Sequence, residues 1–163
     1  MELLPHDPFR LYRTPGVARL YTDLNILHSK GAPDVFVTHK ETPQNLEFVG
    51  AILKNKDAVL FVAQSGGEII GLIQANIMKS PDIPVFVKRK YIHIEDICVE
   101  KKCRRSSVGK RLMESVEQWA AKKGITVIDL NVWDFNKNAM VFFKSIGYTP
   151  ERHYMWKTIA ERK

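Results

Sequence analysis

The stretch that decides the fold runs from residue 91 to residue 132 and reads YIHIEDICVEKKCRRSSVGKRLMESVEQWAAKKGITVIDLNV. Its two apolar ends, Tyr91–Val99 and Ile125–Val132, predict strands. Between them, apolar residues recur at the spacing of one helix face: Val108, Leu112, Val116, Trp119 and Ala120. Gly124 ends that helix as the residue after its cap. A strand–helix–strand unit of this length predicts a right-handed crossover between two parallel strands.

The N-terminal part is predicted to be a short strand, Phe9–Arg13, followed by two helices. A Thr-Pro pair at 14–15 starts the first helix, because the N–H that proline lacks is not needed in a first turn. That helix ends at Gly31 and carries apolar residues at helical spacing: Val17, Leu20, Tyr21, Leu24 and Leu27 or His28. A second Thr-Pro pair at 42–43 opens a helix with its own apolar positions: Leu46, Val49 and Leu53.

The middle of the chain predicts antiparallel strands. The apolar run Ala58–Ala63 and the return strand Ile69–Met78 flank a hairpin signal at Ser65–Glu68. A loop at Lys79–Arg89 then leads into Tyr91–Val99. Two antiparallel pairs therefore precede the parallel unit.

The C-terminal part predicts a helix that stops at Gly147 and a strand, Tyr154–Thr158, that closes the sheet. The inner face of this helix consists of Ala139, Phe142, Phe143 and Ile146. No internal repeat or linker is visible, so we expect residues 1–163 to form a single domain of mixed α/β class.

Composition narrows the class of protein. The 163 residues are 45% hydrophobic, which is enough for a folded core. No apolar run approaches the roughly 20 residues of a membrane span, and the first residues do not resemble a signal peptide. Two cysteines, Cys98 and Cys103, fit no metal motif and predict a reduced, cytoplasmic protein. The net charge of +7 favours an anionic partner: nucleic acid, a membrane surface or a phosphorylated ligand.

Basic residues crowd into the loop between the strand at Tyr91–Val99 and the following helix: Lys101, Lys102, Arg104, Arg105, Lys110 and Arg111. Free backbone N–H groups and the helix dipole favour an anion at that position. The loop has neither the P-loop pattern nor G-x-G-x-x-G. Two interpretations stay open, a pyrophosphate site and a helix that is merely capped beside solvated charges.

This loop resembles the R-x-x-G-x-G/A acetyl-CoA signature of the GNAT superfamily of N-acetyltransferases, with Arg104 first, Ser107 in place of the middle glycine and Gly109 last. Downstream, NKNAMVFFKSIGY at 136–148 is similar to the superfamily's N-x-x-A-x-x-F-Y-x-x-x-G-F. The two motifs stand in the right order and spacing, so the chain is identified as a member over about residues 91–148. The resemblance implies a mixed, mostly antiparallel central sheet flanked by helices, with one parallel strand–helix–strand unit.

The resemblance also implies the cosubstrate acetyl-CoA and no metal. The backbone at Ile97–Val99 would bind the pantetheine arm, and an N–H there would polarise the thioester carbonyl. The loop would hold the pyrophosphate, and Asn136 would contact the cofactor arm or simply cap its helix. The implied cofactor contacts are Ile97, Cys98, Val99, Arg104, Arg105, Ser106, Ser107, Val108, Gly109, Lys110, Asn136 and Phe143.

The implied reaction is transfer of the acetyl group to a primary amine by direct attack in a ternary complex. The amine attacks only when neutral, so a base must accept a proton. Glu95 is the first candidate, because acidic residues on this strand serve that role in related enzymes. His93 shares its face at the strand's period of two, whereas Asp96 points oppositely unless a bulge intervenes. Each has a plainer alternative: a structural or substrate-binding carboxylate for Glu95, and a sheet histidine with satisfied hydrogen bonds for His93.

The chain departs from the superfamily at Phe143, where a tyrosine often protonates the leaving thiolate. Tyr148 and Tyr154 are substitutes by sequence, and a thiolate can also leave unaided. This departure keeps a second function open, a non-catalytic acyl-CoA-binding or regulatory module. Nucleic acid is disfavoured as a partner because the basic cluster has neither a recognition-helix pattern nor interleaved aromatics. We expect no membrane partner, and a homodimer is compatible with the resemblance.

Overall fold

The computed structural model describes residues 2–4, 15–37, 50 and 54–159. The chain divides into two compact units, residues 1–131 and residues 132–163. The elements are, in chain order, β1 (Glu2–Leu4), α2 (Pro15–Gly31), β2 (Ala58–Ser65), β3 (Glu68–Lys79), β4 (Lys90–Val99), the 3₁₀ helix η1 (Lys101–Cys103), α4 (Val108–Lys122), β5 (Ile128–Leu130) and α5 (Lys137–Ser145). Of these, α5 belongs to the second unit. The predicted strand at Phe9–Arg13 and the predicted helix from Thr42 lie outside the described residues.

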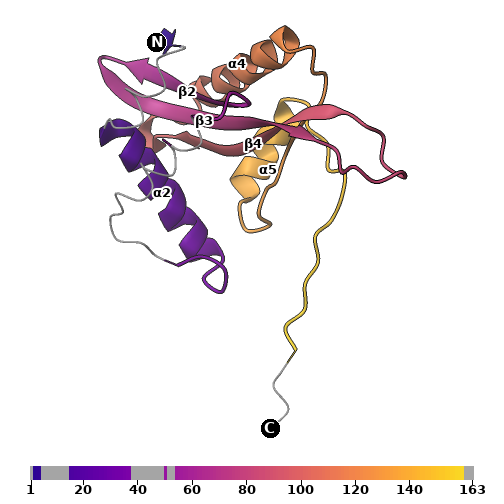
Figure 1. The fold of residues 1–163 in the computed structure, drawn as a ribbon. Helices are drawn as coiled ribbons and strands as arrows, with labels where there is room; N and C mark the ends of the chain where they lie inside the picture. The colour runs from indigo at the N-terminus through magenta and orange to yellow at the C-terminus, as the bar shows by residue number, and fades with distance from the viewer. Residues whose placement is uncertain (1, 5–14, 38–49, 51–53, 160–163) are drawn as a thin grey trace. The chain divides into compact units, whose positions relative to one another are not determined.

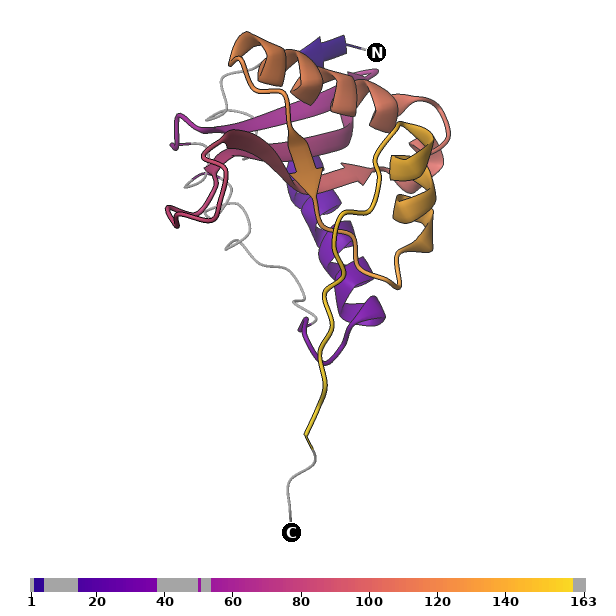
Figure 2. The same cartoon turned by 90° about the vertical axis from the view of Figure 1, so that its right-hand side faces the viewer.

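The five strands form one sheet in the order β1-β2-β3-β4-β5. The pairs from β1 to β4 are antiparallel, and β4 pairs with β5 in parallel. The connection between the parallel strands contains α4, and Figures 1 and 2 show α2 and α4 covering opposite faces of the sheet. The predicted mixed, mostly antiparallel sheet flanked by helices, with one strand–helix–strand unit, is confirmed.

Each helix buries its apolar face against the sheet. On one side, α2 and the sheet share a cluster of buried residues: Val17, Leu20, Tyr21, Leu24, Leu60, Val62, Ile69, Leu72 and Cys98. On the other side, a Cβ at Gly71 would lie 3.1 Å from Val108 Cγ1 and 3.2 Å from Leu112 Cδ1. Glycine at this position therefore lets α4 approach β3 closely.

The strand β4 carries one more residue than β3 across their shared ladder. Gln74 pairs with Asp96 and Ala75 pairs with Ile94, so Glu95 is the extra residue of a β-bulge. On its other edge, the ladder of β4 with β5 covers only Ile92–Ile94 and stops at the bulge. Within the described part of the chain, no strand pairs with that edge of β4 from Glu95 to Val99.

Two details of the predicted parallel unit are wrong. The last strand is Ile128–Leu130 rather than Ile125–Val132, because its ladder ends where the bulge of β4 begins. On the inner face of α4, Met113 is buried at 1% exposure, whereas the predicted Trp119 is half-buried. In α2, the residues Val17, Leu20, Tyr21 and Leu24 are buried as predicted, but Leu27 is 39% exposed, and the buried residue of the last turn is Ser29.

The second unit is built on α5 and the segment that follows it. The Asn136 side chain accepts a hydrogen bond from Ala139 N at 3.2 Å and so caps the helix. Phe143 is buried, with its ring centroid 5.2 Å from that of Phe142 and 5.7 Å from that of Tyr148. The predicted strand Tyr154–Thr158 does not form: the segment is extended and exposed (Figure 2). Its aromatic residues favour a strand, but a strand forms only where a neighbour accepts its hydrogen bonds, and none pairs with this segment in the described chain.

Candidate functional site

A row of polar side chains crosses three strands of the first unit. The ladders place Asn76 of β3 opposite His93 of β4, and His93 opposite Asp129 of β5. His93 Nδ1 lies 2.6 Å from Asp129 Oδ1, and Asn76 Nδ2 donates to Glu95 Oε1 at 2.9 Å. We call these four residues, Asn76, His93, Glu95 and Asp129, the polar row. Both predicted base candidates, His93 and Glu95, belong to it.

The polar row lies on the face of the sheet that α2 covers. Gln74, two residues before Asn76 on the same strand, accepts a hydrogen bond from Tyr21 Oη of α2 at 2.7 Å. Residues two apart on a regular strand share a face. The face of the sheet that α2 covers is thus apolar toward β1 and polar toward β5. The residues of the polar row therefore lie on the same face as α2.

The imidazole of His93 is held from both ring nitrogens. Asn131 Nδ2 lies 3.4 Å from His93 Nε2, and an amide nitrogen can only donate. The ring therefore accepts at Nε2 and donates from Nδ1 to the Asp129 carboxylate. Such a pairing fixes the tautomer and orientation of a histidine. The sequence alone does not single out Asp129 or Asn131; their only signal is that they are polar positions at the end of an apolar run, two residues apart.

The bulge brings Asp96 to the same face as the polar row. Asp96 pairs with Gln74, and opposite residues of an antiparallel pair share a face. Burial, with a smaller contribution from the charge of Glu95, raises the pKa of Asp96 to about 6. In turn burial, with smaller contributions from Asp96 and Cys98, raises the pKa of Tyr21. Glu95 itself is exposed. One exposed carboxyl and one half-buried carboxyl thus stand next to each other in β4.

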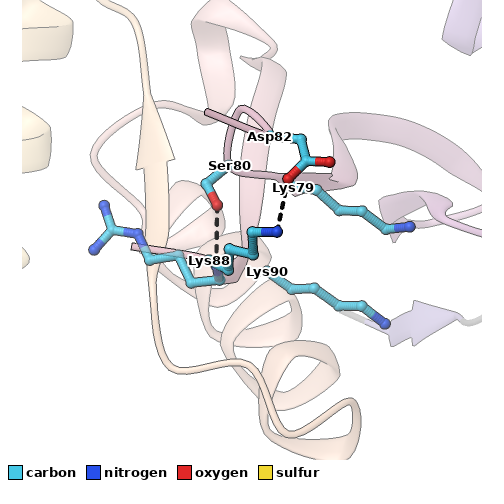
Figure 3. Close-up of a pocket in the computed structure, with 6 residues that line it drawn as sticks. Lys79, Ser80, Asp82, Lys88 and Lys90 are labelled. Carbon is cyan, nitrogen blue, oxygen red and sulfur yellow. Dashed lines mark hydrogen bonds and ion pairs between the residues drawn. The ribbon is translucent and has the colours of Figure 1, made fainter. Parts of the chain in front are cut away.

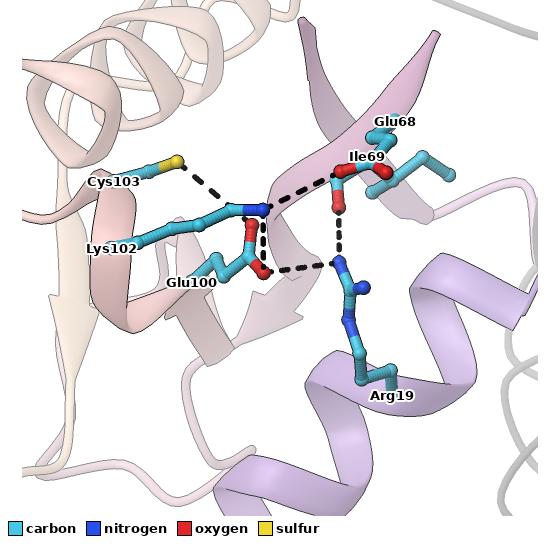
Figure 4. Close-up of polar contacts among 6 residues, drawn as sticks. All are labelled: Arg19, Glu68, Ile69, Glu100, Lys102 and Cys103. Carbon is cyan, nitrogen blue, oxygen red and sulfur yellow. Dashed lines mark hydrogen bonds and ion pairs between the residues drawn. The ribbon is translucent and has the colours of Figure 1, made fainter.

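The loop after β4 is bound to the rest of the first unit by an ion-pair network (Figure 4). Glu100 Oε1 lies 3.5 Å from Arg19 of α2 and 3.5 Å from Lys102 Nζ. Lys102 also lies 3.6 Å from Glu68, and Arg19 donates to Ile69 O at 3.2 Å. These contacts link the start of the loop to α2 and to the start of β3.

Two residues of the predicted phosphate loop have left-handed backbone conformations. Arg105 has φ 62° and Ser107 has φ 64°, a region that side chains other than glycine rarely adopt. Ser107 stands where the sequence pattern has its middle glycine, and the structure shows why glycine suits that position. Left-handed residues within a turn point successive N–H groups into one concavity, which is an anion-binding arrangement. Val108 then starts α4, with Gly109 and Lys110 in its first turn.

The cations of this loop divide into those that bind protein groups and those that do not. Lys102 is paired as described, and Arg104 Nε donates to Val99 O at 3.0 Å. Lys110 makes a contact of 4.0 Å with Glu114. Of the described residues of the loop, Lys101, Arg105 and Arg111 make neither an ion pair nor a side-chain hydrogen bond, whereas Arg104 makes the hydrogen bond but no ion pair. These three are the ones left to meet a phosphate.

The predicted pantetheine segment lies along the unpaired edge of β4. Ile97, Cys98 and Val99 pair with β3 on one side and with no strand on the other in the described chain. The Cys98 thiol points into the apolar cluster under α2. Burial raises its pKa to about 11; nearby Arg104 lowers it, while Asp23 and Asp96 raise it. A thiol with a raised pKa is a poor nucleophile at neutral pH, so the structure gives Cys98 a packing role. Cys103 Sγ lies 3.9 Å from Glu100.

The structure therefore brings most predicted site residues into one unit. Glu95, His93, the segment Ile97–Val99 and the loop Arg104–Lys110 share the first unit, whereas Asn136 and Phe143 belong to the second. The cofactor contacts of Asn136 and Phe143 stay predictions. The residues that sequence reasoning missed are those whose role depends on strand register: Gln74, Asn76, Asp129 and Asn131.

A hollow of about 400 Å³ opens at the other end of the β3–β4 ladder (Figure 3). Lys79 pairs with Lys90 at that end, whereas Gly71 pairs with Val99 next to the loop. The hollow is lined by Lys79, Ser80, Asp82, Lys88, Arg89 and Lys90. Lys88 is paired with Asp82 at 2.7 Å. The full length of the ladder separates this hollow from the loop, and none of its lining residues belongs to the polar row.

Two features are absent from the residues of the chain that the structure describes. None of the helices found there is long and apolar enough to span a membrane. Nor do those residues contain a group of three or more histidine, cysteine, aspartate or glutamate side chains arranged to hold a metal ion.

Comparison with known proteins places the chain in a family. A family model described as "Acetyltransferase (GNAT) family" matches residues 19–148. L-ornithine N5-acetyltransferase NATA1 of Arabidopsis thaliana is 27% identical over 120 residues, which are 74% of this chain but 50% of the plant protein. The uncharacterized N-acetyltransferase YhfO of Bacillus subtilis is 28% identical over 108 residues, covering 66% of this chain and 70% of YhfO.

Among solved structures, a mutant of the BH1408 protein from Bacillus halodurans superposes with a TM-score of 0.88 at 23% identity, covering 98% of this chain and 100% of that one. At this identity the match concerns the fold. The family model crosses the boundary between the two units and spans both sequence motifs. The chain belongs to the acetyltransferase (GNAT) family.

Proposed function

We propose that this protein is an acetyl-CoA-dependent N-acetyltransferase that moves the acetyl group to a primary amine by direct attack in a ternary complex. The observation that carries the proposal is the unpaired edge of β4, Glu95–Val99, which lies between the polar row and the left-handed loop. Family membership supports it. We further propose that residues 1–163 act as one acetyltransferase domain, since the family model covers parts of both units.

The cosubstrate suits the residues on and after β4. The edge of β4 along Ile97–Val99 that pairs with no described strand suits the amide groups of a pantetheine arm, which then takes the place of a neighbouring strand; Val99 O already accepts from Arg104 Nε. An N–H of this edge is the donor for the thioester oxygen, where negative charge develops during attack. The N–H groups of Arg104–Gly109 suit the pyrophosphate, with Lys101, Arg105 and Arg111 nearby for the remaining phosphate. Asn136 and Phe143 complete the arm's contacts by analogy with the family pattern.

The polar row supplies the base. A lysine-type amine with a pKa of about 10.4 is mostly protonated at neutral pH and must lose a proton before it attacks. Glu95 is solvent-exposed and is oriented by Asn76, so it is the first candidate to accept this proton directly or through water. His93, with its Nε2 lone pair and its Asp129 partner, is the second candidate.

The leaving thiolate needs no acid from this chain. Phe143 has no hydroxyl, and its ring packs between Phe142 and Tyr148. A thiol with a pKa of about 8.5 is a tolerable leaving group, and water can protonate it. Direct transfer also agrees with the buried, weakly acidic Cys98, which is a poor covalent intermediate.

The acceptor is proposed to be a cationic primary amine. Three carboxyl groups gather on one face, those of Glu95, Asp96 and Asp129, in a chain with a net charge of +7. A local negative field attracts a positively charged substrate. Ornithine, after which the plant relative L-ornithine N5-acetyltransferase is named, belongs to this class.

A non-catalytic acyl-CoA-binding module is the second candidate, favoured by the absence of a hydroxyl at Phe143. Thiol release from acetyl-CoA, measured with a panel of primary amines including ornithine, separates the two. Amine-dependent thiol release with formation of the acetylated amine supports the enzyme. Tight binding of CoA with no release above the uncatalysed rate for any amine supports the binding module.

A further inference from the structure

One buried polar atom in the polar row has no hydrogen-bond partner. Asn76 Oδ1 is shielded from solvent, and no donor reaches it from the described residues. The other end of the same amide is engaged, because Asn76 Nδ2 donates to Glu95 Oε1 at 2.9 Å. A buried acceptor without a partner costs stability, so such atoms are rare in folded proteins and call for an explanation.

A second amide on the same strand provides the comparison. Gln74 lies two residues before Asn76 and is also buried, at 2% exposure. Its Oε1 accepts from Tyr21 Oη at 2.7 Å, so the protein satisfies the acceptor that faces the α2 core. The acceptor without a partner is the oxygen of Asn76, the amide whose nitrogen donates to the proposed base Glu95. This contrast points to a ligand group, rather than the fold, as the partner of Asn76 Oδ1.

We propose that Asn76 is a positioning residue for the acceptor amine: its Oδ1 accepts the N–H that stays on nitrogen, while its Nδ2 holds Glu95 ready for the N–H that leaves. The inference rests on the proposed function, because it needs an amine beside Glu95. The proposed role of Asn76 also explains why the enzyme would prefer primary amines: one amide side chain has both an acceptor for the amine and a donor for Glu95.

The proton count of the reaction makes the selection specific. A neutral primary amine has two N–H bonds. As its lone pair forms the C–N bond, one N–H proton passes to the Glu95 carboxylate and the C–S electron pair leaves with the thiolate. The second N–H remains as the N–H of the amide product and binds Asn76 Oδ1. A secondary amine has one N–H, which Glu95 must take, so the bond to Asn76 cannot persist through the reaction.

A purely structural role for Asn76, support of the bulge at Glu95, predicts something different. In that case, removing the amide lowers the stability of the fold and affects all amines alike. The two roles therefore separate by selectivity between amines, by the pH profile and by thermal unfolding.

The test uses the full chain, the best primary amine of the panel and the N-methyl derivative of the same amine. For wild type, Asn76→Leu and Asn76→Asp, kcat/KM is measured by thiol release over a range of pH. We expect Asn76→Leu to lower kcat/KM for both amines, because Glu95 loses the donor that orients it, and to lower it about tenfold or more further for the primary amine than for the N-methyl derivative, so the selectivity collapses. The acid limb of its pH profile moves to higher pH, because Glu95 loses a donor to its charged form.

Asn76→Asp is the matched control, since it keeps an oxygen at Oδ1 and removes the donor. We expect this variant to retain the preference for the primary amine. The acid limb of its pH profile of kcat/KM also moves to higher pH, because the donor is lost and a like charge is added near Glu95. Affinity for CoA and the thermal midpoint show that both variants are folded.

If wild type turns over amines and Asn76→Leu keeps the wild-type selectivity, the inference is wrong and the proposed function stands. If wild type binds CoA but acetylates no amine, the proposed function fails and the inference with it. Should Asn76→Leu not fold, loss of selectivity in a folded Asn76→Asp would also overturn the inference.

Discussion

Replacing Ser107 with glycine should make the protein more stable. Ser107 stands immediately before α4 with φ 64° and ψ 2°, and its side chain makes no capping hydrogen bond. The left-handed conformation costs a residue with a Cβ about 1–2 kcal/mol, and glycine adopts it freely. The serine hydroxyl contributes no cap that the substitution would lose.

The gain is reduced by the unfolded state. Glycine has more conformational freedom in the unfolded chain, which lowers stability by about 0.4–1 kcal/mol. The net effect is a stabilisation of about 0.5–1 kcal/mol. For a chain of 163 residues, about 1 kcal/mol corresponds to about 2–4 °C in Tm, so we expect the Tm of Ser107→Gly to rise by about 1–4 °C.

Thermal and urea unfolding of wild type, Ser107→Gly and Ser106→Gly measure this difference. Ser106 is the matched control, because it is not among the residues of positive φ and its hydroxyl donates to Cys103 O. The same substitution one position earlier therefore lowers stability by about 1 kcal/mol or more. The reasoning is refuted if Ser107→Gly unfolds at or below the wild-type temperature, or if both glycine variants shift Tm equally.

Three other variants test separate parts of the site. Arg105→Ala should weaken CoA binding more at low than at high ionic strength. Arg104→Ala should mainly lower Tm, because the Arg104 side chain donates to Val99 O. If calorimetry finds the affinity for CoA unchanged even in the double variant, the loop does not bind the phosphates. The pKa of Asp96 is about 6 in the folded protein against a usual 3.8, so its contribution favours folding below about pH 4 and is lost as the pH rises to about 6. Asp96→Asn should therefore be more stable than wild type at neutral pH but not at about pH 4. Urea unfolding that gives the opposite order of stability contradicts the burial of Asp96. Phe143→Tyr should leave kcat unchanged and lower the free energy of unfolding by about 1 kcal/mol, since a hydroxyl enters a buried site. An increase in kcat that is lost at alkaline pH would show instead that the lack of an acid limits turnover.

The architecture of the first unit could be predicted because its elements are coded locally. Helical spacing of apolar residues marks α2 and α4, and the pair Gly66-Gly67 marks the β2–β3 turn with φ 58° and 81°. The strand at Tyr154–Thr158 was predicted wrongly for the opposite reason. Its aromatic content is a local signal, but pairing depends on an edge that the sequence of the segment does not specify.

The candidate site could be predicted only in part. The loop and the base candidates Glu95 and His93 follow from the motif and from strand period. The bulge at Glu95 does not, because a register shift depends on both strands of a ladder. Without that register, Asn76 is one polar residue in an apolar strand and Asp129 one acidic residue in another. Their contact with Glu95 and His93 exists only once the three strands are aligned.

The most direct test of the account is the rate of thiol release by Glu95→Gln beside wild type, with saturating acetyl-CoA and the best primary amine. Glutamine keeps an oxygen for Asn76 Nδ2 but cannot accept the proton of the amine. The account predicts that kcat falls by about 10²–10⁴, while the affinity for CoA barely changes because the cosubstrate is held by the edge of β4 and the loop. Full turnover by Glu95→Gln from about pH 6 to about pH 9 would contradict it and make His93 the base to examine next.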